Sequence, residues 1–127
     1  MSQNIWEING LSLELDLENA DVMERYERAF DIMAESEKSL PKDGRASERI
    51  RAYCKLFADL FDNIFGAGTS EKIFKDVPVS AAAYEGVYTS FLDAVKAMKM
   101  SSVQRRAQML EKYKPQNRQQ RRAAKKK

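Results

Sequence analysis

The sequence predicts a mainly α-helical (α+β) protein: an N-terminal β-hairpin packed on a bundle of three to four helices, followed by a disordered basic tail. Apolar residues recur at helical spacing in three long segments, residues 19–36, 43–65 and 80–100, which places them on one face of an α-helix. Around Asn9-Gly10, apolar and polar residues instead alternate, as they do in half-buried strands. The last fourteen residues contain no large apolar side chain.

The hairpin is predicted for residues 4–17. Asn9-Gly10 is a strong turn signal, because both central residues of a type I′ turn need a positive φ. Ile5 to Ile8 form the first strand, and the second presents one apolar face through Leu11, Leu13, Leu15 and Leu17. A lone hairpin is marginal in water, so we expect Trp6 to anchor it to the core. Its leucine face should lie on a helix, or its edge should pair with another chain.

The first helix is predicted over residues 19–36, with Asn19 or Asp21 as its cap. Its buried stripe consists of Val22, Tyr26, Phe30 and Met33. Pro41 and Gly44 mark the loop that follows.

The central helix is predicted over residues 43–65 and is the element around which the chain is organised. Asp43 or Ser47 caps its start, and Gly66 fits the left-handed position after its end. Its stripe consists of Ile50, Cys54, Phe57, Phe61 and Ile64, widened by Tyr53 and Leu60. Such a stripe forms plain core, or part of it faces another chain.

A short helix, capped by Thr69 or Ser70 and continuing through about Lys75, should end before Pro78. Ser80 then caps the last long helix, whose stripe consists of Tyr84, Tyr88, Phe91, Val95 and Met98. This stripe matches that of residues 43–65 in length and period, so we expect the two helices to pack antiparallel.

The apolar period fails after Met100, because Ser102 and Arg105 occupy the next two stripe positions. We therefore expect a separate short helix over residues 103–113, with a thin stripe of Val103, Ala107 and Leu110. The domain should span residues 1–113, and the tail residues 114–127.

Composition indicates a single well-solvated domain with two oppositely charged parts. The chain has 127 residues, of which 43% are hydrophobic and 32% charged. Its net charge of +3 conceals an asymmetry: residues 1–100 carry 12 Lys and Arg against 18 Asp and Glu, and residues 101–127 carry 10 against one. The body is thus acidic, at −6, and the C-terminal segment basic, at +9.

The residue types argue against catalysis. There is no histidine, the usual general base and commonest metal ligand. Cys54, the single cysteine, lies on an apolar stripe, where cysteine acts as a small hydrophobe. We expect no cofactor, no metal and no enzymatic activity. The single cysteine excludes an intramolecular disulfide framework and fits a reducing cytoplasm. No apolar run reaches membrane-spanning length, and the N-terminus lacks a secretory pattern, so we expect a non-exported protein with no membrane partner.

The tail, KPQNRQQRRAAKKK, is predicted to be disordered, because it cannot bury enough apolar surface to offset its ordering entropy. Its role stays open between solubilising the protein, docking to an acidic protein and binding nucleic-acid phosphates without sequence preference. No aromatic residue follows Tyr113 to stack on bases. The candidate cations are Arg118, Arg121, Arg122, Lys125, Lys126 and Lys127.

Two features together are similar to a known family. The hairpin segment IWEINGLSLELDL precedes an acidic helical domain, and the tail contains Asn117-Arg118-Gln119-Gln120-Arg121-Arg122. This layout resembles tail assembly chaperones of phages and prophages of Gram-positive bacteria, which often end in an Asn-Arg-x-x-Arg-Arg type tail. The resemblance implies a non-catalytic protein in the bacterial host cytoplasm that coats the tape measure protein, or binds another tail protein. It also implies self-association into a homo-oligomer.

The candidate partner-binding residues come from the two widest stripes, since apolar grooves between helices can accept a partner helix. They are Ile50, Phe57, Phe61, Tyr84, Tyr88 and Phe91. Two alternatives remain: a nucleic-acid-associated accessory protein acting through its basic tail, and a structural tail or connector protein.

Overall fold

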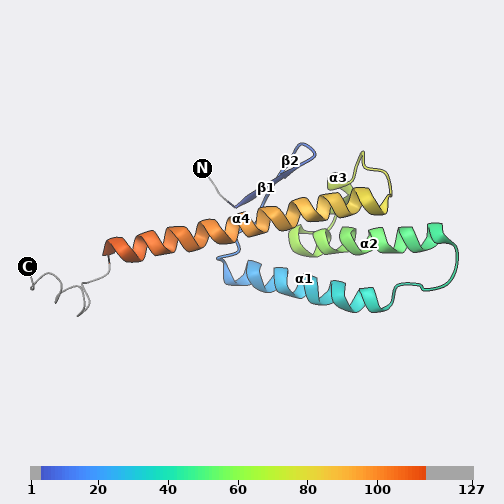
Figure 1. Ribbon diagram of the computed structural model, residues 1–127, viewed down its shortest axis with the longest axis horizontal. Coiled ribbons are helices and arrows are strands. Elements are labelled where there is room, and N and C mark those ends of the chain that lie inside the picture. The colour runs from blue at the N-terminus through green and yellow to red at the C-terminus, as the bar shows by residue number, and fades with distance from the viewer. Residues whose placement is uncertain (1–3, 114–127) are drawn as a thin grey trace, which may run out of the picture.

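The computed structural model describes residues 4–113, and these form a mainly helical fold with an N-terminal hairpin, as the sequence predicts (Figure 1). The expected disorder of the tail concerns residues outside this range. Within the range, the chain forms six elements in order: β1 (Ile5–Ile8), β2 (Leu11–Glu14), α1 (Ala20–Lys38), α2 (Ala46–Phe65), α3 (Thr69–Ile73) and α4 (Ala81–Tyr113).

The hairpin forms around the predicted turn. β1 and β2 pair antiparallel, with Trp6 opposite Leu13. Asn9 has a φ of 49° and Gly10 a φ of 81°, as a type I′ turn requires. The Asn9 side chain also donates a hydrogen bond from Nδ2 to the carbonyl of Ile73 at 2.8 Å, so the turn is fastened to the end of α3.

Trp6 anchors the hairpin to the helices, as expected. Its ring is buried, and its centroid lies 5.2 Å from that of Phe61 and 5.1 Å from that of Phe91. Its Nε1–H donates to the Ser90 hydroxyl at 3.1 Å, so burial leaves no indole donor unpaired. The aromatic centre of the core therefore joins β1, α2 and α4.

Helices α2 and α4 run parallel, and the predicted antiparallel packing is wrong (Figure 1). Residues 66–80, which include α3, lead the chain back alongside α2 before α4 begins. The Phe74 ring stacks there on the Tyr84 ring, with 3.8 Å between the two ring centroids. Helix α1 runs in the opposite direction to both. Three contacts advance together along α2 and α4: Tyr53 with Glu85, Phe57 with Tyr88, and Phe61 with Phe91.

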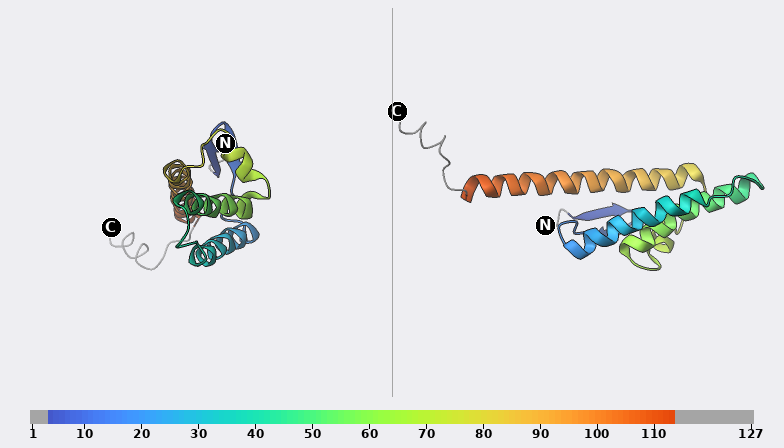
Figure 2. Two further views of the ribbon diagram at one scale, coloured as in Figure 1. Left: turned by 90° about the vertical axis from the view of Figure 1, so that its right-hand side faces the viewer. Right: turned by 90° about the horizontal axis from the view of Figure 1, so that it is seen from below.

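Helix α4 is continuous over Ala81–Tyr113, so the separate short helix predicted for residues 103–113 is wrong. Ser102 and Arg105 interrupt the apolar stripe, but neither breaks helical backbone as Gly or Pro would. The helix consequently projects past the rest of the described fold (Figures 1 and 2). None of the helices within residues 4–113 combines the length and apolar character that crossing a membrane requires.

Two predicted helix caps are confirmed. The Asn19 carboxamide oxygen accepts hydrogen bonds from two backbone N–H groups in the first turn of α1, at 3.0 and 3.2 Å. The Ser80 hydroxyl accepts one from the Ala83 N–H at 3.3 Å, at the start of α4. Both satisfy backbone donors that a helix start would otherwise leave unpaired.

The caps predicted for α2 and α3 are wrong. The residue at the N-cap of α2 is Arg45, whose side chain makes no capping bond. Neither predicted residue is at that position, because Ser47 lies inside the helix and Asp43 lies two residues before Arg45. Gly68 precedes α3 in a left-handed conformation. Neither Thr69 nor Ser70 caps α3; the Asp62 carboxylate of α2 instead accepts from the Ser70 N–H at 2.8 Å and hydroxyl at 2.9 Å.

Candidate partner-binding site

A groove of about 640 Å³ opens between α1, α2 and α4, a volume within the roughly 300–1,000 Å³ typical of ligand sites. Each of the three helices contributes apolar residues to the groove, because its apolar face is wider than the area that the neighbouring helices cover. The apolar floor consists of Phe30 and Met33 of α1, Leu56 and Phe57 of α2, and Tyr88 of α4. The other lining residues are Ala34, Glu37, Tyr53, Glu85 and Thr89.

Two carboxylates make the rim of this groove acidic. Glu37 lies at the end of α1 and Glu85 in the second turn of α4. The Tyr53 hydroxyl donates to Glu85 at 2.5 Å, and this bond, with smaller contributions from burial and from the Glu85 charge, raises the pKa of Tyr53 to about 12. Burial, followed by the Glu37 charge, raises the pKa of Tyr88. The groove therefore favours an apolar segment that also carries positive charge.

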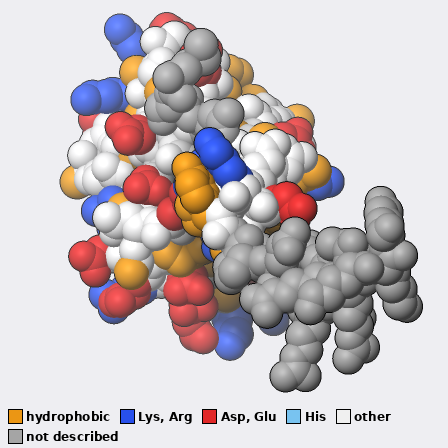
Figure 3. All heavy atoms as spheres, turned by 90° about the vertical axis from the view of Figure 1, so that its left-hand side faces the viewer, with side chains coloured by type: hydrophobic (Ala, Val, Ile, Leu, Met, Phe, Trp, Pro, Cys, Tyr) orange, Lys and Arg blue, Asp and Glu red, His pale blue; other side chains and the backbone are white. Residues whose placement is uncertain are grey.

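A second apolar surface lies on the C-terminal end of α4, which we call the α4 overhang (residues 100–113). Ala107 continues the spacing set by Met100, Val103 and Leu110, so these four residues share one helical face. Hydrophobic and basic side chains lie next to one another at this end of the molecule (Figure 3). The large hydrophobic residues of the overhang that are exposed are Met100, Val103, Met109, Leu110 and Tyr113.

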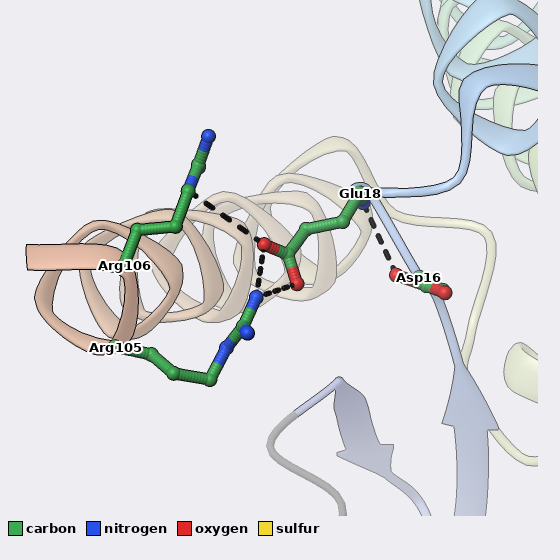
Figure 4. A network of polar contacts seen from close by, with 4 residues as sticks. All are labelled: Asp16, Glu18, Arg105 and Arg106. Carbon is green, nitrogen blue, oxygen red and sulfur yellow. Dashed lines mark hydrogen bonds and ion pairs between the residues drawn. The ribbon is translucent and has the colours of Figure 1, made fainter. Parts of the chain in front are cut away.

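The base of the overhang is tied to the loop between β2 and α1 by a charged network (Figure 4). Both Glu18 carboxylate oxygens accept hydrogen bonds from the Arg105 guanidinium, and Arg106 Nε lies 3.8 Å from one of them. The Glu18 backbone N–H donates to the Asp16 carboxylate at 3.1 Å. These contacts connect the overhang to the β2–α1 loop, although ion pairs as exposed as these contribute little stability each.

A sequence profile of a family of unknown function, DUF6673, matches residues 9–125. The chain belongs to this family. No curated protein and no solved structure matches the chain. The matched range contains both the groove and the α4 overhang, so both are features of the segment that the family profile covers.

The predicted partner-binding residues of this DUF6673 chain divide into two groups. Phe57, Phe61, Tyr84 and Phe91 are buried against their own chain. Ile50 is exposed, at 40% of its full area, and Tyr88 is half-buried on the groove floor. Phe57 is also one of the groove-floor residues. The predicted basic residues Arg118, Arg121, Arg122, Lys125, Lys126 and Lys127 lie outside the described residues.

The groove contains residues that sequence reasoning did not select for binding. Phe30 and Met33 were expected on a buried stripe, yet both remain half-buried at the groove. Glu37 and Glu85 had no distinguishing signal, because they sit 48 positions apart in a sequence rich in surface acids. Only the way in which α1 and α4 meet brings these two carboxylates to one opening.

Two findings concern the reactive and metal-binding side chains of the described residues. Cys54 is buried, and burial, with a smaller contribution from Glu85, raises the pKa of its thiol, which disfavours the nucleophilic thiolate. Within residues 4–113, no three His, Cys, Asp or Glu residues are grouped so as to hold a metal ion.

Proposed function

We propose that this chain is a non-catalytic phage tail assembly chaperone that holds a helical segment of the tape measure protein during tail assembly. The observation that carries the proposal is the groove between α1, α2 and α4, with its apolar floor and its acidic rim. An elongated helical protein needs its apolar stripes covered until the tail tube encloses it, and such a groove suits this task.

The groove has the chemistry of helix-in-groove recognition. A partner helix would insert apolar side chains at i, i+3 or i+4 spacing between Phe30, Met33 and Tyr88. A lysine or arginine flanking those side chains would meet Glu37 or Glu85. We therefore expect the bound segment of the tape measure protein to be amphipathic and basic along one edge.

The charge distribution favours one second candidate, a nucleic-acid-associated accessory protein. Residues 101–127 carry a net charge of +9, and clustered cations bind nucleic acid by releasing counterions from its phosphates. Such binding needs no groove, so a variant that blocks the groove separates the two candidates. A structural tail or connector protein would instead be retained in finished particles.

The test is co-purification of the tape measure protein with Ala34→Arg. Ala34 is exposed on the groove wall, so the guanidinium would fill the groove and neutralise its rim without replacing a core residue. We expect capture to weaken about tenfold or more, equivalent to roughly 1.4 kcal/mol or more. Ile32→Arg is the matched control, because Ile32 is exposed and lies on nearly the opposite side of α1. Equal capture by both variants would contradict the proposal.

A further inference from the structure

We propose that copies of this chain associate head to tail, with the α4 overhang of one copy seated in the groove between α1, α2 and α4 of the next. The groove is apolar with an acidic rim, and the overhang has an exposed apolar stripe within a basic segment of the chain. Each surface thus has the chemistry that the other favours, and both are present on every copy.

The apolar parts match in kind. Met100, Val103 and Leu110 form an exposed stripe on one face of α4, and Leu110 keeps 59% of its area exposed. The groove offers Phe30, Met33 and Tyr88 to such a stripe. Seating the stripe there would remove both apolar surfaces from water, which is the main favourable contribution to association.

The charges match in sign. Arg106 borders the stripe on one side of α4, and residues 101–127, which contain most of the stripe, carry +9. Glu37 and Glu85 border the groove on a body, residues 1–100, that carries −6. An overhang-to-overhang contact would bring two strongly basic segments together, whereas an overhang-to-groove contact pairs opposite charges and steers the encounter.

The contact has to form between two copies. Tyr88 and Leu110 lie on the same uninterrupted helix, 22 residues apart, which corresponds to roughly 33 Å at about 1.5 Å per residue. A continuous helix cannot fold back to place its end in a groove at its beginning. Glu18 contacts Arg105 and Arg106 at the base of the outward-pointing overhang (Figure 4).

Such a contact is heterologous, because it joins two different surfaces. Each added copy leaves one groove and one overhang unused, so assembly continues into a ring or an open chain. The same groove would then be occupied by a neighbouring copy until a partner helix displaces it. This competition rests on the proposed function, whereas the self-association does not.

Analytical ultracentrifugation of the full chain alone tests the association. We expect the mass to rise with concentration above that of the 14.6 kDa monomer. Leu110→Glu should abolish this rise, because it directs a carboxylate at Glu37 and Glu85. Gln108→Glu is the matched control: it adds the same charge on nearly the opposite face of α4 and should associate as wild type does. A monomer at every concentration, or equal loss in both variants, would overturn the proposal.

Mixing two inactive variants tests the head-to-tail arrangement. Ala34→Arg keeps an intact overhang, and Leu110→Glu keeps an intact groove, so each alone should be monomeric. Their mixture has one working pair of surfaces and should form a dimer that grows no further. If Ala34→Arg alone associates, the overhangs bind one another, and if Leu110→Glu alone associates, the grooves do; either result overturns the proposal.

Circular dichroism should show that each variant stays folded. Thr89→Arg, at an exposed position on the α4 wall of the groove, replaces Ala34→Arg if the latter unfolds. These experiments contain no tape measure protein. Their failure would therefore leave the proposed partner binding standing, and failure of partner capture would leave the self-association standing.

Discussion

Among single residues, Gly10 has a backbone conformation that residues other than glycine adopt only with strain. Its φ is 81°, and a Cβ added there would meet no atom within 4 Å, so the cost of substitution is backbone strain and not a clash. We expect Gly10→Val to lower the free energy of unfolding by about 1 kcal/mol or more. Chemical denaturation measures this, and an unchanged midpoint would mean that the turn does not contribute to stability.

Tyr53 gives the groove a measurable pH dependence. Its pKa rises from the usual 10.0 to about 12 because its hydroxyl donates to Glu85, so the folded state binds the phenolic proton more tightly than the unfolded state. The resulting stabilisation is fully present below about pH 10 and is lost as the pH rises toward 12. We expect Glu85→Gln, which removes the charged acceptor, to lower this pKa.

The measurement is a spectrophotometric titration of tyrosinate in the wild type and in Glu85→Gln. From each titration curve, the curve of the same protein with Tyr53→Phe added is subtracted. This difference isolates Tyr53 from Tyr26, Tyr84 and Tyr88, whose pKa values burial also raises. It is read only at pH values where circular dichroism remains helical. A Tyr53 midpoint near 10 with Glu85 intact would contradict the hydrogen bond.

Residue identity predicted the core better than it predicted polar contacts. Burial of Trp6, Phe61 and Phe91 follows from large apolar side chains at regular spacing. The bond from Asn9 to the Ile73 carbonyl spans 64 positions and the pair between Glu18 and Arg105 spans 87. Local periodicity contains no information about which distant segments meet, so such contacts cannot be inferred from one sequence.

At the scale of elements, α4 determines how far the overhang reaches. Gly86 is the residue of α4 with the lowest intrinsic helix propensity. Glycine in a helix interior is less favourable than alanine by about 0.5–1 kcal/mol. Gly86 is exposed, and a Cβ there would meet no atom within 4 Å. We therefore expect Gly86→Ala to raise the free energy of unfolding by about that amount, measured by chemical denaturation. Gly10→Ala should have the opposite effect, and a loss at both positions would contradict an open site at Gly86.

The elements themselves were predictable, but their relations were not. Helical periodicity identified α1, α2 and α4, and Asn9-Gly10 identified the hairpin. The direction of α4 against α2 depends on the path of residues 66–80, which two matching stripes do not reveal. The expected break near Ser102 confused the end of the apolar stripe with the end of the helix, although backbone continuity requires only helix-compatible residues.

For the whole molecule, the candidate site was only partly predictable. An apolar stripe shows which face of a helix avoids water, but not what covers it. Consequently Phe61, Tyr84 and Phe91, selected as partner-binding residues, are covered by the chain itself. The acidic body and basic C-terminal segment were evident from composition alone. The fold adds that the groove and the overhang involve opposite ends of α4, the long helix of Figure 1.

Most of the basic charge of residues 101–127 lies in residues 114–127, outside the groove, so a deletion can remove that charge and keep the groove. Within residues 4–113, the buried core runs from Trp6 to Met98, so we expect a chain lacking residues 114–127 to keep its helical spectrum and its melting temperature. Seven of the ten cations of residues 101–127 are lost in that deletion, with no acid. We expect capture of the tape measure protein to be weakened but retained at physiological salt, because the groove supplies most of the affinity.

Nucleic acid should respond differently from the protein partner. If the intact chain neutralises about six or more phosphates, its affinity for duplex DNA or RNA should fall on the order of a thousandfold between roughly 50 and 200 mM salt, because counterion release drives such binding. Capture through an apolar groove should change far less over that range, since burial of apolar surface is not screened by salt. A salt titration of full-length protein on duplex nucleic acid, run beside capture by the truncated chain, compares the two. Tight nucleic-acid binding that survives about 200 mM salt, or complete loss of the protein partner on truncation, would favour the nucleic-acid function over the chaperone.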